Sequence, residues 1–199
     1  MAWNDEAASW DDNPAVCAYA EAAFGSLEQA LGERGVSLQD ARVLDFGCGT
    51  GLLAVAMARV AREVVALDNA PAMIEVLKRK GNGKVKPICG LLSEAVEEGL
   101  LSPGSFDLVT CSSVCAFLDD YPGTLVQLAA LLAPGGLLVQ WDWELDPEVE
   151  EPMGLSREDI KAAMATAGLV DVSVEVGFRQ PFEDRVMKPL RGVGRRPEG

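Results

Sequence analysis

The sequence predicts an α/β fold built on a doubly wound, mostly parallel sheet of seven strands, with helices on both faces and an antiparallel strand at one edge. Two observations carry this prediction. Short β-branched and apolar runs alternate with helical segments of about 10 to 15 residues, which is typical of parallel strands joined by crossover helices. Near the carboxyl terminus, the alternating run 170–176 is followed by a second strand-like segment at 185–190, and such a pair gives a parallel sheet an antiparallel edge.

Helices are expected where apolar residues recur at three- and four-residue spacing. Asn13-Pro14 supplies the cap and first turn of an Ala-rich helix. Pro71 begins another helix, whose last turn is basic, as the helix dipole favours. Ser156 with Asp159 is a variant of the capping box. In chain order, the expected helices are 13–31, 52–61, 71–80, 94–101, 118–133 with its start at Tyr121-Pro122, and 156–167.

Strands are expected where short runs of β-branched or large apolar residues lie between turn residues. The turns are rich in glycine and proline, as in SPGS at 102–105 and PGG at 134–136. In chain order, the expected strands are 41–46, 63–67, 85–89, 106–111, 137–141, 170–176 and 185–190.

One domain is expected over residues 1–199, because a chain of 199 residues that is about half apolar can bury a single core. We divide it into an amino-terminal helical lid (1–35), a cofactor-binding core (40–177), and a terminal edge strand and tail (178–199). The acidic amino terminus does not resemble a signal peptide, and no run approaches the roughly 20 apolar residues of a membrane span. A cytoplasmic protein without a membrane partner is therefore expected.

Charge and side-chain chemistry exclude several classes of function. The net charge of −14 and the pI near 4.4 argue against a nucleic-acid partner, because basic residues cluster only at 78–80 and 191–196. The five cysteines form no C-x-x-C pair, and the chain has no histidine, so no metal site and no Ser-His or Cys-His nucleophile pair is expected. The cysteines are Cys17, Cys48, Cys89, Cys111 and Cys115.

The glycine turn after the first strand predicts a nucleoside ligand. Residues 43–51 read VLDFGCGTG, and glycines let the backbone pass close to a ligand. Asp68 ends the second strand, where a carboxylate can accept both hydroxyls of a ribose. NAD is the competing ligand, but its G-x-G-x-x-G pattern would place a glycine where Leu52 stands. Asp45 before the turn would repel a pyrophosphate and suits a cationic ligand instead.

Residues 45–51 resemble motif I of class I S-adenosylmethionine-dependent methyltransferases, in the small-molecule, type 11 form of that family. The resemblance implies a Rossmann-like fold. Asp68-Asn69 with Met73 resembles the second motif, FDLV at 106–109 the fourth strand, and LAPGG at 132–136 the turn before the fifth. The resemblance covers about residues 40–177. Trp10-Asp11-Asp12 and Tyr19 also resemble the amino-terminal helix that lies over the cofactor in many members.

The resemblance implies S-adenosylmethionine as cofactor, with S-adenosylhomocysteine as product. Asp45 would lie near the amino group, Asp68 would hold the ribose hydroxyls, and Leu91 stands where the family commonly has an acid that accepts from the adenine amino group. Backbone contacts would remain at Leu91 and Leu92, and the backbone at Cys111 would lie close to the transferring methyl. The implied cofactor-binding residues are Asp45, Gly47, Cys48, Gly49, Thr50, Gly51, Asp68, Asn69, Met73, Leu91, Leu92 and Cys111.

The catalytic residues stay open at this point. Methyl transfer from a sulfonium depends mainly on positioning, and a base is needed only for a protonated nucleophile of high pKa. The candidates for that base are Asp119, Asp120, Tyr121, Asp142 and Glu144. The stretch 141–144, WDWE, has two interpretations. It binds a cationic or aromatic molecule, or one Trp lies in the core, the other Trp covers it, and the acids are exposed on a loop. Cys111 and Cys115 can likewise be small buried side chains.

The sequence thus predicts a methyltransferase acting on a small-molecule acceptor. Two alternatives stay open: a protein methyltransferase acting on a basic segment, and a non-catalytic nucleoside-binding or partner-activating subunit.

Overall fold

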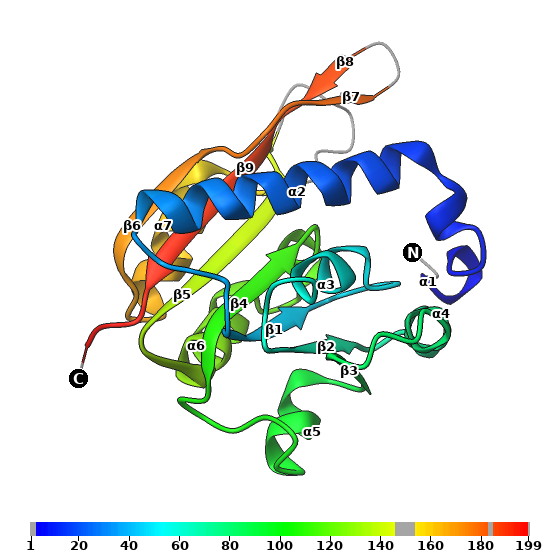
Figure 1. The fold of residues 1–199 in the computed structure, drawn as a ribbon. Coiled ribbons are helices and arrows are strands. Elements are labelled where there is room, and N and C mark those ends of the chain that lie inside the picture. Colours follow the sequence, from blue (N-terminus) through cyan, green and yellow to red (C-terminus); the bar gives the residue numbers. More distant parts are fainter. Residues whose placement is uncertain (1–2, 146–153, 183–184, 199) are drawn as a thin grey trace.

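The computed structural model describes residues 3–145, 154–182 and 185–198. Most of the acidic loop expected after the fifth strand, residues 146–151, lies outside this part of the chain. The described residues form a seven-stranded sheet in the order β3-β2-β1-β4-β5-β9-β6 and a separate two-stranded hairpin, β7-β8 (Figure 1). The strands are β1 Arg42–Phe46, β2 Glu63–Asp68, β3 Val85–Cys89, β4 Phe106–Ser112, β5 Leu132–Trp143, β6 Val170–Val176, β7 Gln180–Phe182, β8 Arg185–Met187 and β9 Pro189–Arg195.

Helices cover both faces of the sheet (Figure 1). One core cluster joins α2, α3 and α4 to the sheet, and the other joins α5, α6 and α7 to its opposite face. None of the helices in the described part is long and apolar enough to cross a bilayer. The helices are α1 Trp3–Glu6, α2 Pro14–Glu33, α3 Leu52–Met57, α4 Pro71–Arg79, α5 Leu92–Glu97, α6 Tyr121–Leu131 and α7 Arg157–Thr166, with 3₁₀ turns η1 Trp10–Asp12 and η2 Cys115–Phe117.

The predicted fold class is confirmed. Strands β1 to β5 pair in parallel, and β9 runs antiparallel between β5 and β6. Strand order reverses between β1 and β4, because β1 to β3 extend to one side and β4 onward to the other. Parallel sheets of this topology bind ligands at such a point, outside the carboxyl ends of the strands.

The carboxyl-terminal strand differs from the expectation in two ways. Residues 185–187 pair with 180–182 in the small hairpin, so the strand expected at 185–190 is found at 189–195. That strand is not the terminal edge strand expected within 178–199, because β6 occupies the edge. Gly192 and Gly194 make this strand hard to predict from the sequence, because glycine is depleted in β-strands. Here a Cβ on Gly192 would lie 2.6 Å from the Ile160 side chain of α7, so helix packing requires the glycine.

A second difference concerns the turn before the fifth strand. PGG at 134–136 was expected to stop the preceding helix and precede strand 137–141, whereas β5 already begins at Leu132. Phe106 of β4 pairs with Leu132, and Leu108 pairs with Leu137, so a register shift in β4 accommodates the extra residues of β5. Gly136 is required there, because its Cβ would lie 2.9 Å from the carbonyl oxygen of Ala133.

Candidate functional site

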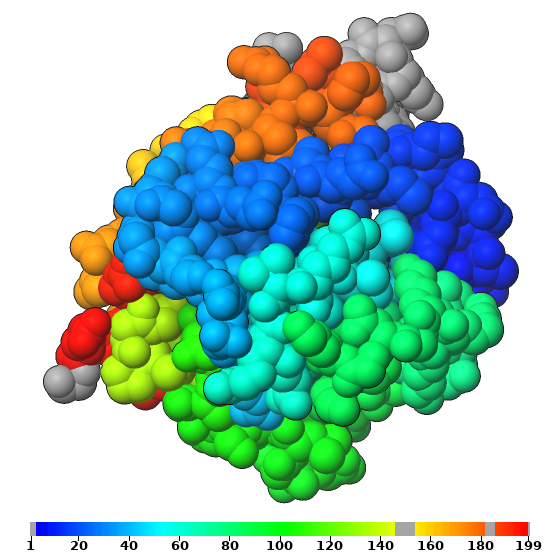
Figure 2. Space-filling model, viewed as in Figure 1, coloured from blue at the N-terminus to red at the C-terminus, as the bar shows by residue number. Residues whose placement is uncertain are grey.

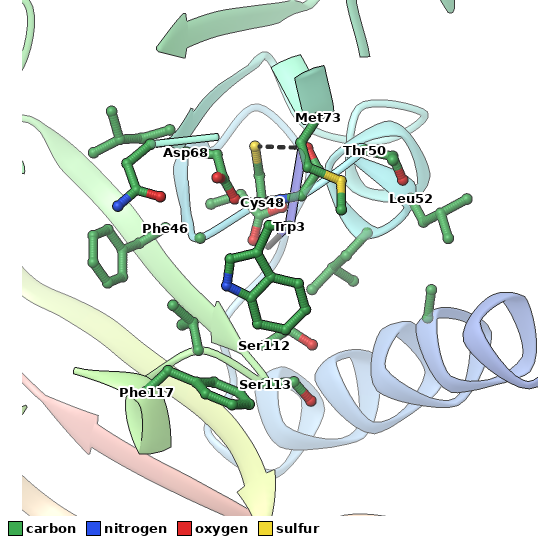
Figure 3. Close-up of a pocket in the computed structure, with 18 of the residues that line it drawn as sticks. Trp3, Phe46, Cys48, Thr50, Leu52, Asp68, Met73, Ser112, Ser113 and Phe117 are labelled. Atoms are coloured by element: carbon green, nitrogen blue, oxygen red, sulfur yellow. Dashed lines mark hydrogen bonds between the residues drawn. The ribbon is translucent and has the colours of Figure 1, made fainter. Parts of the chain in front are cut away.

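A pocket of about 860 Å³ lies at the carboxyl ends of β1, β2, β4 and β5, under the amino-terminal residues. Helix α1, dark blue in Figure 2, lies against the green segment that contains α4. In Figure 3, Cys48, Asp68 and Met73 lie at one end of the pocket, and Ser112, Ser113 and Phe117 lie at the other. We call these ends the glycine-turn end and the β4 end.

The glycine turn is held by the end of the neighbouring strand. The N–H groups of Gly47 and Cys48 both donate to the carbonyl oxygen of Leu67, at 2.8 and 3.1 Å. Gly49 has a φ of +54° and open space where a Cβ would stand, so the backbone faces the pocket without a side chain. Gly51 instead is the N-cap residue of α3 and packs against Leu77, outside the pocket lining.

Asp45 places a buried carboxylate beneath the turn. It is 1% exposed, and its Oδ1 accepts a hydrogen bond from Thr110 Oγ1 at 2.7 Å. Its Oδ2 is buried without a hydrogen-bond partner among the described residues. Burial, aided by the charge of Asp68 and opposed by the Thr110 hydrogen bond, raises the pKa of Asp45 to about 7. A carboxylate that lines a pocket with one oxygen unpartnered suits a ligand with a cationic or N–H group there.

Asp68 connects the glycine turn to the next helix. Its Oδ2 accepts from the N–H of Gly49 and its Oδ1 from the N–H of Ala70, each at 2.8 Å. A carboxylate has about four lone-pair positions, so each oxygen can accept one further hydrogen bond from a ligand in the pocket. Asn69 and Met73 follow Asp68 along the lining. This arrangement fits a ribose diol next to an adenine.

The structure brings most of the predicted cofactor-binding residues to this one pocket, and it leaves two of them elsewhere. Gly51 is outside the lining, and Cys111 is fully buried in the core. Leu91 lines the pocket, but its N–H already donates to Glu94 Oε2 at 3.1 Å, so it is not free for an adenine. The predicted residues in the lining are Asp45, Gly47, Cys48, Gly49, Thr50, Asp68, Asn69, Met73, Leu91 and Leu92.

Of the five candidate bases, Glu144 lines the pocket. Its carboxylate pairs with Arg157 at 3.0 Å. The hydroxyl of Tyr121 donates to Gln140 at 2.7 Å, and Asp120 caps α6. Asp142 is buried behind the lining. Burial raises its pKa to about 7, and hydrogen bonds, including one from the Ala116 N–H, partly oppose this rise. The structure therefore brings no second carboxylate from this set to the pocket surface.

The two tryptophans of the stretch 141–144 have different environments. Trp141 is fully buried and donates from Nε1 to Ser26 Oγ at 3.1 Å, so it belongs to the core. Trp143 lies two residues further along the same strand face and lines the pocket. Its ring packs against that of Tyr19, with centroids 5.2 Å apart. Trp141 thus agrees with the core interpretation. Trp143 lines the pocket, and binding of a ligand by this residue stays a prediction.

An amino-terminal clasp, formed by Asp11, Thr50 and Lys80, joins the first residues to the glycine turn. Thr50 Oγ1 donates to Asp11 Oδ1 at 2.6 Å, and Lys80 Nζ lies 2.7 Å from Asp11 Oδ2. Lys80 also donates to the carbonyl oxygen of Thr50 at 2.7 Å. The ring of Trp3 meets that of Phe117 edge to face at 5.4 Å, which extends this cover to the β4 end. The sequence predicts an amino-terminal lid but does not indicate Lys80 as a partner, because nothing in a basic helix end marks such a contact.

Asp11→Ala is expected to speed release of a bound nucleoside about three- to tenfold, because it removes two charged hydrogen bonds that close the pocket. Unfolding free energy should fall by less than about 1 kcal/mol, since the ion pair is partly exposed to solvent. Stopped-flow displacement of bound S-adenosylhomocysteine measures the rate. Asp12→Ala, the same change at the exposed neighbouring residue, is the control. Equal release rates for both variants would contradict a role for the clasp.

Known proteins resemble this chain in fold, and some resemble part of its sequence. A family model described as methyltransferase domain matches residues 44–140. A ubiquinone biosynthesis O-methyltransferase of Xanthomonas campestris pv. campestris is 38% identical over 103 residues, which are 52% of this chain and 43% of that relative. The chain therefore aligns with less than half the length of this curated relative.

Two solved structures share the fold at 18% identity each. An S-adenosylmethionine-dependent methyltransferase from Mesorhizobium loti has a TM-score of 0.65, with 86% of this chain and 98% of the other covered. A methyltransferase solved in complex with the Haloferax volcanii Trm112 methyltransferase activator has a TM-score of 0.75, with 98% of both chains covered.

Proposed function

We propose that the chain carries a class I methyltransferase domain that transfers the methyl group of S-adenosylmethionine to a small-molecule acceptor. The family and the fold imply S-adenosylmethionine as cofactor. The observation that best supports this proposal is the glycine-turn end of the pocket. It combines Asp68, whose carboxylate can accept ribose hydroxyls, with the buried carboxylate of Asp45, whose Oδ2 has no hydrogen-bond partner among the described residues.

The residues present fit this cofactor. Asp45 would face the amino group of the methionine part, and Asp68 the ribose hydroxyls, while Gly49 leaves room for close backbone approach. Asn69 and Met73 would flank the adenine. When bound, S-adenosylmethionine supplies an electrophilic methyl group to a nucleophile and leaves as S-adenosylhomocysteine.

The protein's own contribution to the reaction is then chiefly positioning and exclusion of water. The Asp11, Thr50 and Lys80 clasp and the Trp3–Phe117 contact would enclose the reactants. Holding two reactants in line can lower a barrier by about 7 to 11 kcal/mol in well-oriented cases. The O-methyltransferase relative supports oxygen as the acceptor atom.

Calorimetry with S-adenosylmethionine, S-adenosylhomocysteine and NAD tests the proposal. We expect the first two to bind and NAD not to bind. NAD binding without the others would overturn the proposal. Tight cofactor binding with no methyl transfer to phenols, amines, carboxylic acids or basic peptides would favour the non-catalytic alternative.

Cofactor affinity is expected to rise with pH up to about pH 7 and to level off above it. The ionised Asp45 has to meet the cofactor's cationic group, and its pKa in the free protein is about 7. Well below that pKa, the affinity should change about tenfold per pH unit. Calorimetry with S-adenosylhomocysteine from pH 5.5 to 8.5 measures the slope, and Asp45→Asn should remove it. The same slope in the variant would assign the pH dependence to another group.

The stability of the free protein should respond to Asp45 with the opposite sign. The pKa of this carboxyl is raised in the folded state from the model-peptide value of 3.8, so the folded protein binds more protons than the unfolded chain between about pH 4 and 7. The contribution of Asp45 to unfolding free energy is therefore present below pH 4 and is lost as the pH rises through 7. The Asp45→Asn variant should lose less stability than the wild type over that window.

A further inference from the structure

The β4 end of the pocket contains two hydroxyls that the protein itself leaves unpaired. Tyr19 Oη and Ser113 Oγ are buried without a hydrogen-bond partner among the described residues, and both residues line the pocket. They come from α2 and from the loop that follows β4. Leaving a buried hydroxyl unpaired costs about 1 to 3 kcal/mol, so such groups call for a specific reason.

Both residues line the same pocket, and Ser113 is held beside β5, because its N–H donates to the carbonyl oxygen of Trp141 at 2.7 Å. Burial raises the pKa of Tyr19 above its usual value, and the hydroxyls of Ser113 and Ser112 oppose that rise. The Tyr19 ring is fixed from two sides, by Trp143 at 5.2 Å and by Phe178 at 4.9 Å between centroids. This packing limits how far the Tyr19 hydroxyl can turn away to find another partner. A ligand in the pocket can supply the missing hydrogen bonds.

The charges of the lining select against anions. Four acidic residues, Glu6, Asp45, Asp68 and Glu144, line the described part of the pocket, which includes no lysine or arginine. Glu144 is paired with Arg157, and Asp142 behind the lining uses both oxygens in hydrogen bonds to Ala116 and Gln140. A carboxylate or phosphate on the acceptor would therefore find no basic side chain in this lining, and a cationic acceptor would meet Glu144, whose charge Arg157 already offsets.

The walls of the β4 end are aromatic. Trp143, Phe117 and Tyr19 contribute to the lining there, with aliphatic side chains from Val114 and Leu118. Aromatic rings pack well against such surfaces, and each stacked or edge-on pair adds about 0.5 to 1.5 kcal/mol beyond the area buried. The shape and chemistry therefore favour a flat ring over an extended peptide.

Resting on the proposed function, we propose that the β4 end binds an uncharged phenol-type acceptor whose hydroxyl is held by Tyr19 Oη and Ser113 Oγ. The ring of this acceptor packs against Trp143 and Phe117. Tyr19 donates to the acceptor oxygen, and Ser113 accepts the acceptor's own O–H. The second lone pair of that oxygen is then left free toward the glycine-turn end.

Binding of matched probes to the complex with S-adenosylhomocysteine tests this assignment. The probes are 2-naphthol, naphthalene, 2-naphthoate and 2-naphthylmethylammonium, which share one ring system and differ in hydroxyl and charge. We expect 2-naphthol to bind at least about tenfold more tightly than naphthalene and than either charged probe. Tighter binding of a charged probe, or no preference for 2-naphthol over naphthalene, would overturn the proposal.

The variants Tyr19→Phe and Ser113→Ala make the test specific to the two hydroxyls. Each should weaken 2-naphthol binding about three- to tenfold and leave naphthalene binding unchanged. The melting temperature of each free variant should stay the same or rise, because the deleted hydroxyl has no protein partner. Unchanged 2-naphthol affinity in both variants would contradict the assignment.

Tyr121→Phe is the matched control. Its hydroxyl bonds to Gln140 outside the lining, so this variant should lose stability and keep the affinity for 2-naphthol. The experiment also distinguishes the proposed function from the phenol site. Failure of wild-type protein to bind S-adenosylhomocysteine would contradict the proposed function, whereas normal cofactor binding without discrimination among the probes would contradict the phenol site alone.

Discussion

Asp68→Ala is expected to weaken S-adenosylhomocysteine binding at least about thirtyfold, or roughly 2 kcal/mol. The carboxylate would accept from two ribose hydroxyls while it holds the N–H groups of Gly49 and Ala70. Hydrogen bonds to a charged group contribute about 1.5 to 3 kcal/mol each, and removing Asp68 also loosens the glycine turn. Calorimetry at fixed pH and ionic strength measures the loss.

Two further variants separate these contributions. Asn69→Ala changes a neighbouring lining residue without touching the carboxylate and should cost less than about 1 kcal/mol of affinity. Asp68→Asn keeps the size of the side chain but turns one acceptor into a donor that faces an N–H, so we expect most of the loss to persist. Reduced stability of Asp68→Ala with unchanged affinity would limit Asp68 to a structural role.

Gly47→Ala is expected to lower the free energy of unfolding by about 2 to 5 kcal/mol. Gly47 has a φ of +67°, where a side chain is strained, and a new Cβ would lie 2.7 Å from Val114 Cβ. Val114 lines the pocket, so the displaced loop should also disturb ligand binding. Urea unfolding of both proteins measures the difference.

Gly49→Ala distinguishes steric overlap from backbone strain. Its φ is also positive, at +54°, but a Cβ there would meet no atom within 4 Å. We expect a stability loss of only about 1 to 2 kcal/mol, with a larger effect on cofactor affinity because the methyl group enters the pocket. Equal destabilisation by the two substitutions would show that strain alone accounts for Gly47.

The cofactor half of the site was largely predictable because its chemistry is local in sequence. The glycine turn and Asp68 each follow a strand directly, and the carboxyl ends of neighbouring parallel strands meet at one edge of the sheet. Cys111 was open to two interpretations. Its side chain is buried in the core, which agrees with the interpretation of this thiol as a small core side chain. Close approach of its backbone to the transferring methyl stays a prediction.

The β4 end of the pocket could not be derived from local patterns. Tyr19 and Ser113 are separated by 94 positions, and neither lies in a motif that predicts a shared cavity. The clasp between Asp11 and Lys80 likewise depends on where the amino-terminal residues lie against α4. The pocket wall from β7 and β8 required a hairpin that the sequence does not mark with a strong turn signal.

By itself, the sequence determined the alternating α/β architecture, the glycine turn and the acidic residue after the second strand, because periodicity and backbone freedom are properties of neighbouring residues. Only the tertiary structure decided where the last strand inserts, which carboxylates reach the pocket, and which hydroxyls remain unpaired inside it. Those outcomes depend on packing and burial between distant segments, and the free energy of a buried polar group is set by partners that the local sequence does not specify.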